Sequence, residues 1–340
     1  MAEDTPDEIT AIRSYKLVCS KLGIVMCVYF ICRILSSLIT GLIIKSLGET
    51  GNAAYILSYA AVVLMVYVIP LSVTAVFFRS FSHYRGKLRE LYNKPKRLAR
   101  ALGTFPAMYG LGFGIALLTL LVFYLISRAT GGQTLIEDMI RPTALEPPTT
   151  VTGALLLVFV LVVIAPVLEE LWTRGIIFDA LKPYGNGVAI IFSSILFGLM
   201  HGSLQMLFYS TALGFALGYV RYATGSLFAV TVLHAIINAV AAGFLFLSTL
   251  TEITHGANKL VNTFLNVYAL AWLVLIFVGV VAFFIRLSTI RRYSIENPWN
   301  EISAGRKTAV FFTSIPVIIM LVLAINEHSN NRLLGLIFKM

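Results

Sequence analysis

Long apolar segments are the feature of this sequence that most constrains its fold. Stretches such as 53–78 and 103–127 contain no charged side chain. An α-helix rises about 1.5 Å per residue, so about 20 apolar residues cross a hydrocarbon layer of roughly 30 Å. Several segments reach this length. The sequence therefore predicts an all-α, polytopic bundle of transmembrane helices.

The composition agrees with a membrane protein and excludes some other classes. Of the 340 residues 58% are hydrophobic and only 12% are charged, whereas a soluble domain carries roughly 25% charged residues. The formal charge of +10 is concentrated in short loops, where basic residues indicate membrane orientation. We therefore interpret it as a topology and lipid-headgroup signal, not as a nucleic-acid site.

We expect eight or nine spans. Their approximate limits are 22–44, 53–78, 103–127, 151–178, 187–205, 207–222, 226–248, 264–285 and 309–326. The pair between 187 and 222 is the least regular, because Gly202 and Ser203 divide it into two segments of marginal length. A re-entrant hairpin is an alternative for this pair.

The loop 79–100 sets the expected orientation. It holds eight basic residues against the single acid Glu90: Arg79, Arg85, Lys87, Arg89, Lys94, Lys96, Arg97 and Arg100. By the positive-inside rule this loop and the N-terminus are cytoplasmic, and the segment 129–150 lies outside. The acidic start and the long first apolar run show no signal-peptide pattern, so we expect a multi-pass protein of the cell membrane.

The chain divides into three regions. We assign 1–149 to an N-terminal transmembrane region, 150–250 to a central block and 251–340 to a C-terminal transmembrane region. An ionisable side chain inside the membrane is costly and is functional by default. The first span holds only Arg33, whereas the central block holds five ionisable residues and one amide: Glu169, Glu170, Arg174, His201, His234 and Asn238. We expect the chemistry in the central block.

The pair Glu169-Glu170 ends a long apolar run and is followed by Arg174. At about 100° per residue, Glu170 and Arg174 lie one turn apart on one face of a helix, and Glu169 points about 100° away from Glu170. Glu170 is thus expected to pair with Arg174 while Glu169 faces another group. The alternative is that these charges mark the cytoplasmic end of the fourth span.

Two further helices supply polar groups. His201 follows Phe197 by four residues, and His234 precedes Asn238 by four, which places the latter two on one helix face. A carboxylate can deprotonate water, imidazoles can share the proton or bind a metal, and an amide can donate to an oxyanion. Together these groups contain the parts for hydrolysis.

The three motifs resemble those of the CAAX prenyl protease and bacteriocin-processing family, or Abi family, whose pattern is EExxxR, FxxxH and HxxxN. Here the motifs are Glu169 to Arg174, Phe197 to His201 and His234 to Asn238, in the same order. The resemblance implies that Glu169 activates water with help from His201. It implies that His234 and Asn238 hold the oxyanion and that Glu170 and Arg174 position Glu169. It also makes Glu169, His201 and His234 candidate ligands for Zn²⁺ or another divalent metal, although a metal-free glutamate mechanism is an alternative.

The resemblance implies an intramembrane endopeptidase that cleaves a lipidated or leader-bearing peptide or membrane protein. Two other functions are open at this point: a non-proteolytic scaffold that modulates a membrane partner such as a sensor kinase, and a transporter. One feature fits poorly, since the span limits put Glu169 nearer the cytoplasmic side and His201 nearer the outer side. Either the helices are longer and tilted, or the fifth span starts near Leu181.

Close helix packing is expected in the sixth span. Gly214 and Gly218 form a GxxxG pattern there, which lets helix backbones approach each other. We expect packing within the bundle, with dimerisation as the alternative.

Overall fold

The protein is an all-α bundle, as predicted. The computed structural model describes residues 6–47, 52–79, 92, 95, 98–130, 148–290 and 302–328, and all regular structure in these ranges is helical. Most of the loop 79–100, the segment 131–147 and the chain after 328 lie outside the described residues. The predicted orientation of the basic loop and the N-terminus therefore stays a prediction.

The N-terminal region contains the first three apolar helices. Its elements are α1 (Pro6–Leu47), α2 (Asn52–Val62), the π-helical η1 (Val63–Val68), α3 (Ile69–Arg79), α5 (Leu98–Leu102) and α6 (Phe105–Thr130). The elements α2, η1 and α3 follow one another without a gap and form one continuous span.

The central block begins with a second continuous helix. Its elements are α8 (Val151–Phe159), η2 (Val160–Ile164), α9 (Ala165–Glu170), η3 (Leu171–Ile177), α10 (Phe178–Leu181), η4 (Lys182–Tyr184), α11 (Asn186–Leu199), α12 (Leu204–Thr224) and α13 (Leu227–Ile253). The C-terminal elements are α14 (Lys259–Ile290), α15 (Ala304–Thr313) and α16 (Ile315–His328).

The number of spans is smaller than predicted. Within the described residues six helices are long and apolar enough to cross a membrane, and a seventh span is possible if α15 and α16, bent by 70°, count as one. The predicted span 187–205 is the helix α11, which has only 14 residues, and 207–222 falls in α12, which is not among the six. The estimate of eight or nine spans is therefore not confirmed.

The predicted break between these two helices is present. α11 ends at Leu199 and α12 begins at Leu204, with Gly202 at a φ of 71°. Ser203 caps the new helix by accepting a hydrogen bond from the backbone N–H of Met206 at 3.2 Å. The left-handed glycine turns the chain, so α11 and α12 pack against each other.

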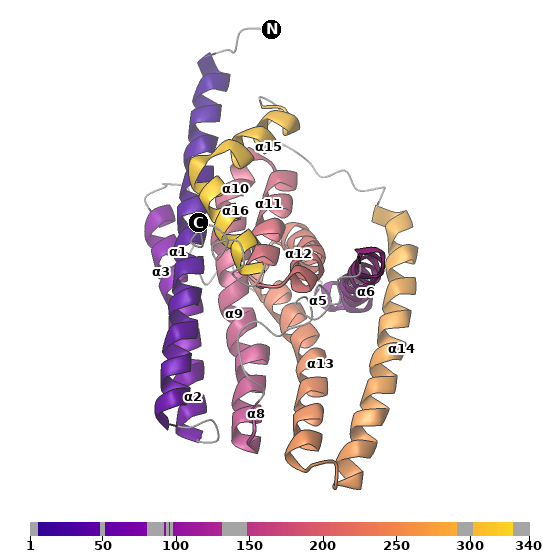
Figure 1. Cartoon of the computed structure of the whole chain (residues 1–340). Helices are drawn as coiled ribbons and strands as arrows, with labels where there is room; N and C mark the ends of the chain where they lie inside the picture. The colour runs from indigo at the N-terminus through magenta and orange to yellow at the C-terminus, as the bar shows by residue number, and fades with distance from the viewer. Residues whose placement is uncertain are drawn as a thin grey trace.

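The helices do not all run in one direction (Figure 1). The long helices α1, α13 and α14 lie roughly along one axis, whereas α6 and α12 are seen nearly end-on. α14 stands at the outer edge of the bundle beside α6. Gly110 and Gly279 let these two backbones touch, because a Cβ on Gly110 would lie 1.9 Å from the Gly279 carbonyl carbon.

The main apolar core lies where α1 meets the central block and the C-terminal helices. It contains Leu22 and Met26 of α1, Ile177 at the end of η3, and Met320 of α16, all fully buried. This core also packs against α11: the ring of Phe192 in α11 stacks on the ring of Phe311 in α15, with 4.1 Å between the ring centroids. Helices from the N- and C-terminal regions of the chain thereby support α11, the helix that carries the FxxxH motif.

The helix that carries the glutamate pair is longer than predicted. The continuous helical segment Val151–Tyr184 has 34 residues, so Glu169 lies near the middle of this helix. The helix is therefore longer than the predicted span, and α11 begins at Asn186 and not near Leu181. The depth of the glutamate pair in the bilayer stays a prediction.

Candidate active site

π-helical turns flank the glutamate pair on both sides. η2 precedes the six-residue helix α9, which ends at Glu170, and η3 follows it. A π turn inserts an extra residue into a helix and is common at functional sites. The faces of this helix are therefore not those of a uniform α-helix, and the positions of the side chains have to be taken from the structure itself.

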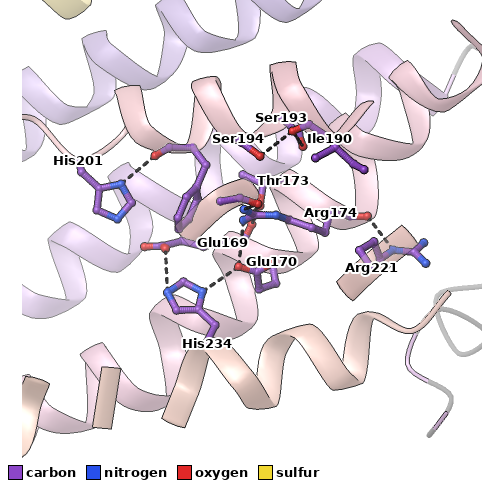
Figure 2. A network of polar contacts seen from close by, with 12 residues as sticks. Glu169, Glu170, Thr173, Arg174, Ile190, Ser193, Ser194, His201, Arg221 and His234 are labelled. Atoms are coloured by element: carbon purple, nitrogen blue, oxygen red, sulfur yellow. Dashed lines mark hydrogen bonds and ion pairs between the residues drawn. The ribbon is translucent and has the colours of Figure 1, made fainter. Parts of the chain in front are cut away.

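Glu170, Arg174 and His234 form a buried cluster (Figure 2). Arg174 Nη1 donates to Glu170 Oε1 at 3.0 Å, and His234 Nδ1 donates to the same oxygen at 2.8 Å. Glu170 and Arg174 are fully buried. Among the described residues Glu170 Oε2 and Arg174 Nε are buried without a hydrogen-bond partner, so this ion pair is monodentate. The predicted pairing of Glu170 with Arg174 is present.

Arg174 in η3 also contacts the helices α11 and α12. Its Nη2 donates to the Gly214 carbonyl at 3.1 Å, and its guanidinium carbon lies 4.3 Å from the centroid of the Phe197 ring. A Cβ on Gly214 would meet Arg174 Nη2 at 3.2 Å and Ser194 Cα at 3.0 Å. The GxxxG pattern thus serves packing inside the bundle, between α11 and α12.

Glu169 faces the opposite side of the cluster. Its Oε1 accepts a hydrogen bond from the Tyr67 hydroxyl at 3.0 Å, and its Oε2 lies 3.8 Å from His234 Nε2. Glu169 is 8% exposed, whereas Glu170 is fully buried. The two adjacent glutamates therefore have different environments: Glu170 is neutralised by Arg174, and Glu169 shares its surroundings with an imidazole.

The charges in this cluster leave room for one additional proton. Glu170 and Arg174 cancel each other, whereas an ionised Glu169 beside a neutral His234 leaves one negative charge in a buried place. An unpaired buried charge is costly. One proton held by either Glu169 or His234 removes it.

His201 lies on the other side of Glu169 (Figure 2). In this view the Glu169 carboxylate lies between the rings of His201 and His234. His201 Nδ1 donates to the Phe197 carbonyl at 2.8 Å, so in the neutral ring Nε2 carries the lone pair. Figure 2 shows His201 on the side of Glu169 away from His234, and its predicted role beside the glutamate stays a prediction.

Phe197 explains the aromatic position of the FxxxH motif. Its ring makes edge contacts with both imidazoles, at 4.8 Å from the His201 ring and 5.6 Å from the His234 ring. The Arg174 guanidinium lies over the face of the same ring. Phe197 therefore contacts both histidines and packs against the arginine.

Asn238 lies on the same helix as His234, and one of its two amide N–H groups already has a hydrogen-bond acceptor. Its amide nitrogen donates to the Leu161 carbonyl at 2.8 Å, a backbone group in the π turn η2. One amide N–H remains for another acceptor. His234 and Asn238 thus lie on one face of α13, as their spacing indicated.

The candidate metal ligands do not form a three-residue metal site. Within the described part of the chain no group of three or more His, Cys, Asp and Glu side chains is close enough together to hold a metal ion. Catalytic zinc sites use three protein ligands. Metal binding by Glu169, His201 and His234 therefore stays a prediction, and we derive no step through a metal.

Sequence reasoning missed several residues near the site. Tyr67 belongs to an apolar span in which one tyrosine gives no distinctive signal.

Arg33 was noted in the sequence, but its contacts were not predicted. Its Nη1 donates to the Met200 carbonyl, directly before His201, and to the Tyr29 hydroxyl at 3.2 Å. Arg221 donates to the Arg174 carbonyl at 3.1 Å and pairs with Asp179 at 3.2 Å. These contacts brace the polar cluster from three other helices.

The loop 79–100 also reaches the site. Tyr92 is half-buried, and its hydroxyl is fully shielded from solvent. Burial raises the pKa of Tyr92, and the negative charge of Glu170 raises it further, whereas the Thr231 hydroxyl opposes the rise. A residue of the basic loop therefore lies close to the buried glutamate.

The fold and the site define a polytopic membrane protein with a buried carboxylate–histidine site assembled from several helices. Residues 151–240 match the family model described as type II CAAX prenyl endopeptidase Rce1-like. No curated protein and no solved structure shows a significant match to the chain. The matched block 151–240 contains all three motifs, so this comparison agrees with their resemblance to the CAAX prenyl protease family.

Proposed function

We propose that this integral membrane protein is an endopeptidase in which Glu169 activates water to hydrolyse a peptide bond of a membrane-associated substrate. The observation that carries the proposal is the division of labour between the two glutamates. Glu170 is neutralised by Arg174 and holds His234 at 2.8 Å, while Glu169 accepts a hydrogen bond from Tyr67 and lies 3.8 Å from His234 Nε2. Such a carboxylate is suited to a general base.

The reaction follows from these groups. Glu169 takes a proton from water, and the hydroxide adds to the scissile carbonyl carbon while the carbonyl electrons move to oxygen. When the tetrahedral intermediate collapses, the C–N bond breaks and the proton on Glu169 passes to the leaving amine. His201 Nε2 accepts a hydrogen bond from the second O–H of the water and so orients the water for attack.

Two groups are available to the oxyanion. Asn238 retains one amide N–H beyond its bond to Leu161. His234 donates its Nδ1–H to Glu170, so its Nε2 donates only when the ring is protonated. We therefore assign the oxyanion to Asn238 together with the imidazolium form of His234.

The substrate class follows from the membrane setting and the family. The site lies within transmembrane helices, and the matching family is one of prenyl endopeptidases. We propose a lipidated or leader-bearing peptide or membrane protein that enters from the bilayer or the cytoplasmic side. The N-terminus and the basic loop 79–100 are cytoplasmic in this proposal.

The test is cleavage by the detergent-purified protein. A panel of prenylated C-terminal peptides and leader-bearing peptides is incubated with wild type, Glu169→Ala and His234→Ala. Glu252→Ala and His255→Ala are matched controls, since both residues are exposed at the far end of α13. We expect cleavage to be lost in the site variants and retained in the controls.

Two outcomes would contradict the proposal. If well-folded wild type cleaves no peptide, or if Glu169→Ala cleaves normally, the protease assignment is wrong. Parallel reactions with a chelator address the metal question: unchanged cleavage supports the metal-free glutamate mechanism. Loss of cleavage that Zn²⁺ restores would show instead that a metal takes part.

A further inference from the structure

The span formed by α2, η1 and α3 lies alongside the glutamate helix, and side-chain hydrogen bonds join it to that helix and to the residues just before it. Tyr55 contacts Thr149 at 2.9 Å, and the Tyr59 hydroxyl reaches the Gly153 carbonyl at 3.5 Å. Further along both segments, Tyr67 bonds Glu169 at 3.0 Å, and Trp172 Nε1 donates to Thr74 at 2.8 Å.

These contacts give the two segments a parallel register. The partners on both segments advance together along the chain, from Tyr55 with Thr149 to Thr74 with Trp172. Tyr67 is therefore fixed opposite Glu169 by contacts on either side of it, and not only by its own hydrogen bond.

The two oxygens of Glu169 have separate partners. Oε1 accepts the hydrogen bond of Tyr67, while Oε2 lies 3.8 Å from His234 Nε2. A carboxylate with one oxygen held by a donor has a fixed rotation about its last bond. The remaining oxygen then has a defined direction toward the imidazole.

We propose that Tyr67 is a positioning residue for Glu169: its hydroxyl holds Oε1, so that Oε2 is the oxygen that takes the proton from water. This inference rests on the proposed function and extends it. It makes the span 52–79, which lies outside the matched block 151–240, a part of the active site.

The local helix geometry supports this role. Tyr67 lies in the π-helical η1, Val63–Val68, and a π turn redirects a side chain relative to a regular helix. Glu169 itself stands between the π turns η2 and η3. Both partners of the hydrogen bond thus come from, or lie next to, helix irregularities.

The first measurement is steady-state kinetics of Tyr67→Phe, with Tyr59→Phe as the matched control on the same span. Tyr59 donates its hydroxyl hydrogen bond to the backbone carbonyl of Gly153 at 3.5 Å, not to Glu169. We expect Tyr67→Phe to lower kcat roughly 10- to 100-fold with KM nearly unchanged, because a misdirected base slows the chemical step. Tyr59→Phe should keep both constants.

A double substitution separates positioning from general packing. In a Glu169→Asp background the shorter carboxylate no longer meets the Tyr67 hydroxyl, so adding Tyr67→Phe should lower kcat far less than it does in the wild type. An equal loss in both backgrounds would overturn the proposal, because the effect of Tyr67 would then not pass through Glu169.

A second readout needs no substrate. The difference between infrared spectra of wild type and Glu169→Gln isolates the Glu169 carboxyl band, whose frequency depends on its hydrogen bonds. We expect the band to shift in Tyr67→Phe and not in Tyr59→Phe. An unshifted band would disprove the contact, and a shifted band with normal kcat would disprove its role in positioning. Wild type that shows the band but cleaves nothing would instead overturn the proposed function, and with it the catalytic part of this inference.

Discussion

Two equally apolar segments of this molecule have opposite surroundings. The glutamate helix Val151–Tyr184 has a mean hydropathy of 2.9 in its most apolar window and α14 has 2.7, yet 33% of that window is buried in the first and 6% in the second. Hydropathy reports that a helix lies in the membrane, but it does not distinguish protein-facing from lipid-facing surfaces. The polar residues make that distinction, since α9 and η3 bury Glu170 and Arg174 whereas α14 exposes residues such as Phe277.

The largest effect should come from the reacting carboxylate. Glu169→Gln keeps the size of the side chain but removes the base, so kcat should fall roughly 10²- to 10⁴-fold. The free energy of unfolding should stay the same or rise, because one charge leaves a buried site. Peptide cleavage and denaturant unfolding in detergent measure the two quantities. If Glu169→Gln lowers the free energy of unfolding as well as kcat, Glu169 is also a structural residue, and its proposed difference from the ion-paired Glu170 is wrong.

The next effect should come from the buried ion pair. Arg174→Met leaves Glu170 without its counter-charge, and breaking a buried pair in this way costs about 3–5 kcal/mol. The free energy of unfolding in detergent is the measurement. As a control, Arg128→Met removes an exposed charge at the end of α6 and should have little effect. Equal values for the two variants would mean that the central block is not the more tightly coupled region.

A smaller effect is expected where α14 meets the bundle. Gly110→Ala places a Cβ 1.9 Å from the Gly279 backbone, whereas the same change at Gly114 meets only Val280 Cγ2 at 3.7 Å. Overpacking of this kind costs about 1–3 kcal/mol. Unfolding of the two alanine variants should therefore separate them, with Gly110→Ala the less stable. If both unfold alike, α14 does not depend on the close approach of the two glycines.

The smallest effect should come from the outer face of α14. Phe277 is 70% exposed, and a lipid-facing side chain remains in lipid when helices separate, so Phe277→Ala should change the free energy of unfolding by less than about 0.5 kcal/mol. A cost above 2 kcal/mol in the same assay would indicate that another surface covers this helix.

The sequence predicted the fold class and the composition of the site for clear physical reasons. Long apolar segments require membrane-spanning helices, and ionisable residues such as Glu169 and His234 are rare enough inside them to mark a site. The expected pairing of Glu170 with Arg174 is confirmed, because a spacing of four residues brings the side chains together even in a helix with a π turn.

Other features were not predicted. α11 ends at Leu199, before the turn at Gly202, so the predicted span 187–205 became a helix of 14 residues. The π turns around α9 have no sequence pattern that predicts them, and the approach of Tyr67 to Glu169 is set by the packing of two spans. Motif spacing also does not reveal how close the candidate metal ligands lie, and within the described residues no three His, Cys, Asp or Glu side chains form a group that could hold a metal ion.

The four-residue spacing of Glu170 and Arg174 also has a consequence for biosynthesis. His234 lies 64 residues after Glu170, so at about 5–20 residues per second the ribosome adds it roughly 3 to 13 s later. During that interval the new helix would have to enter the bilayer with a bare carboxylate if the counter-charge came from a distant segment. Because the arginine is supplied one turn later on the same helix, the pair is close to electroneutral as soon as it is made, and membrane insertion of this segment does not have to wait for the rest of the active site.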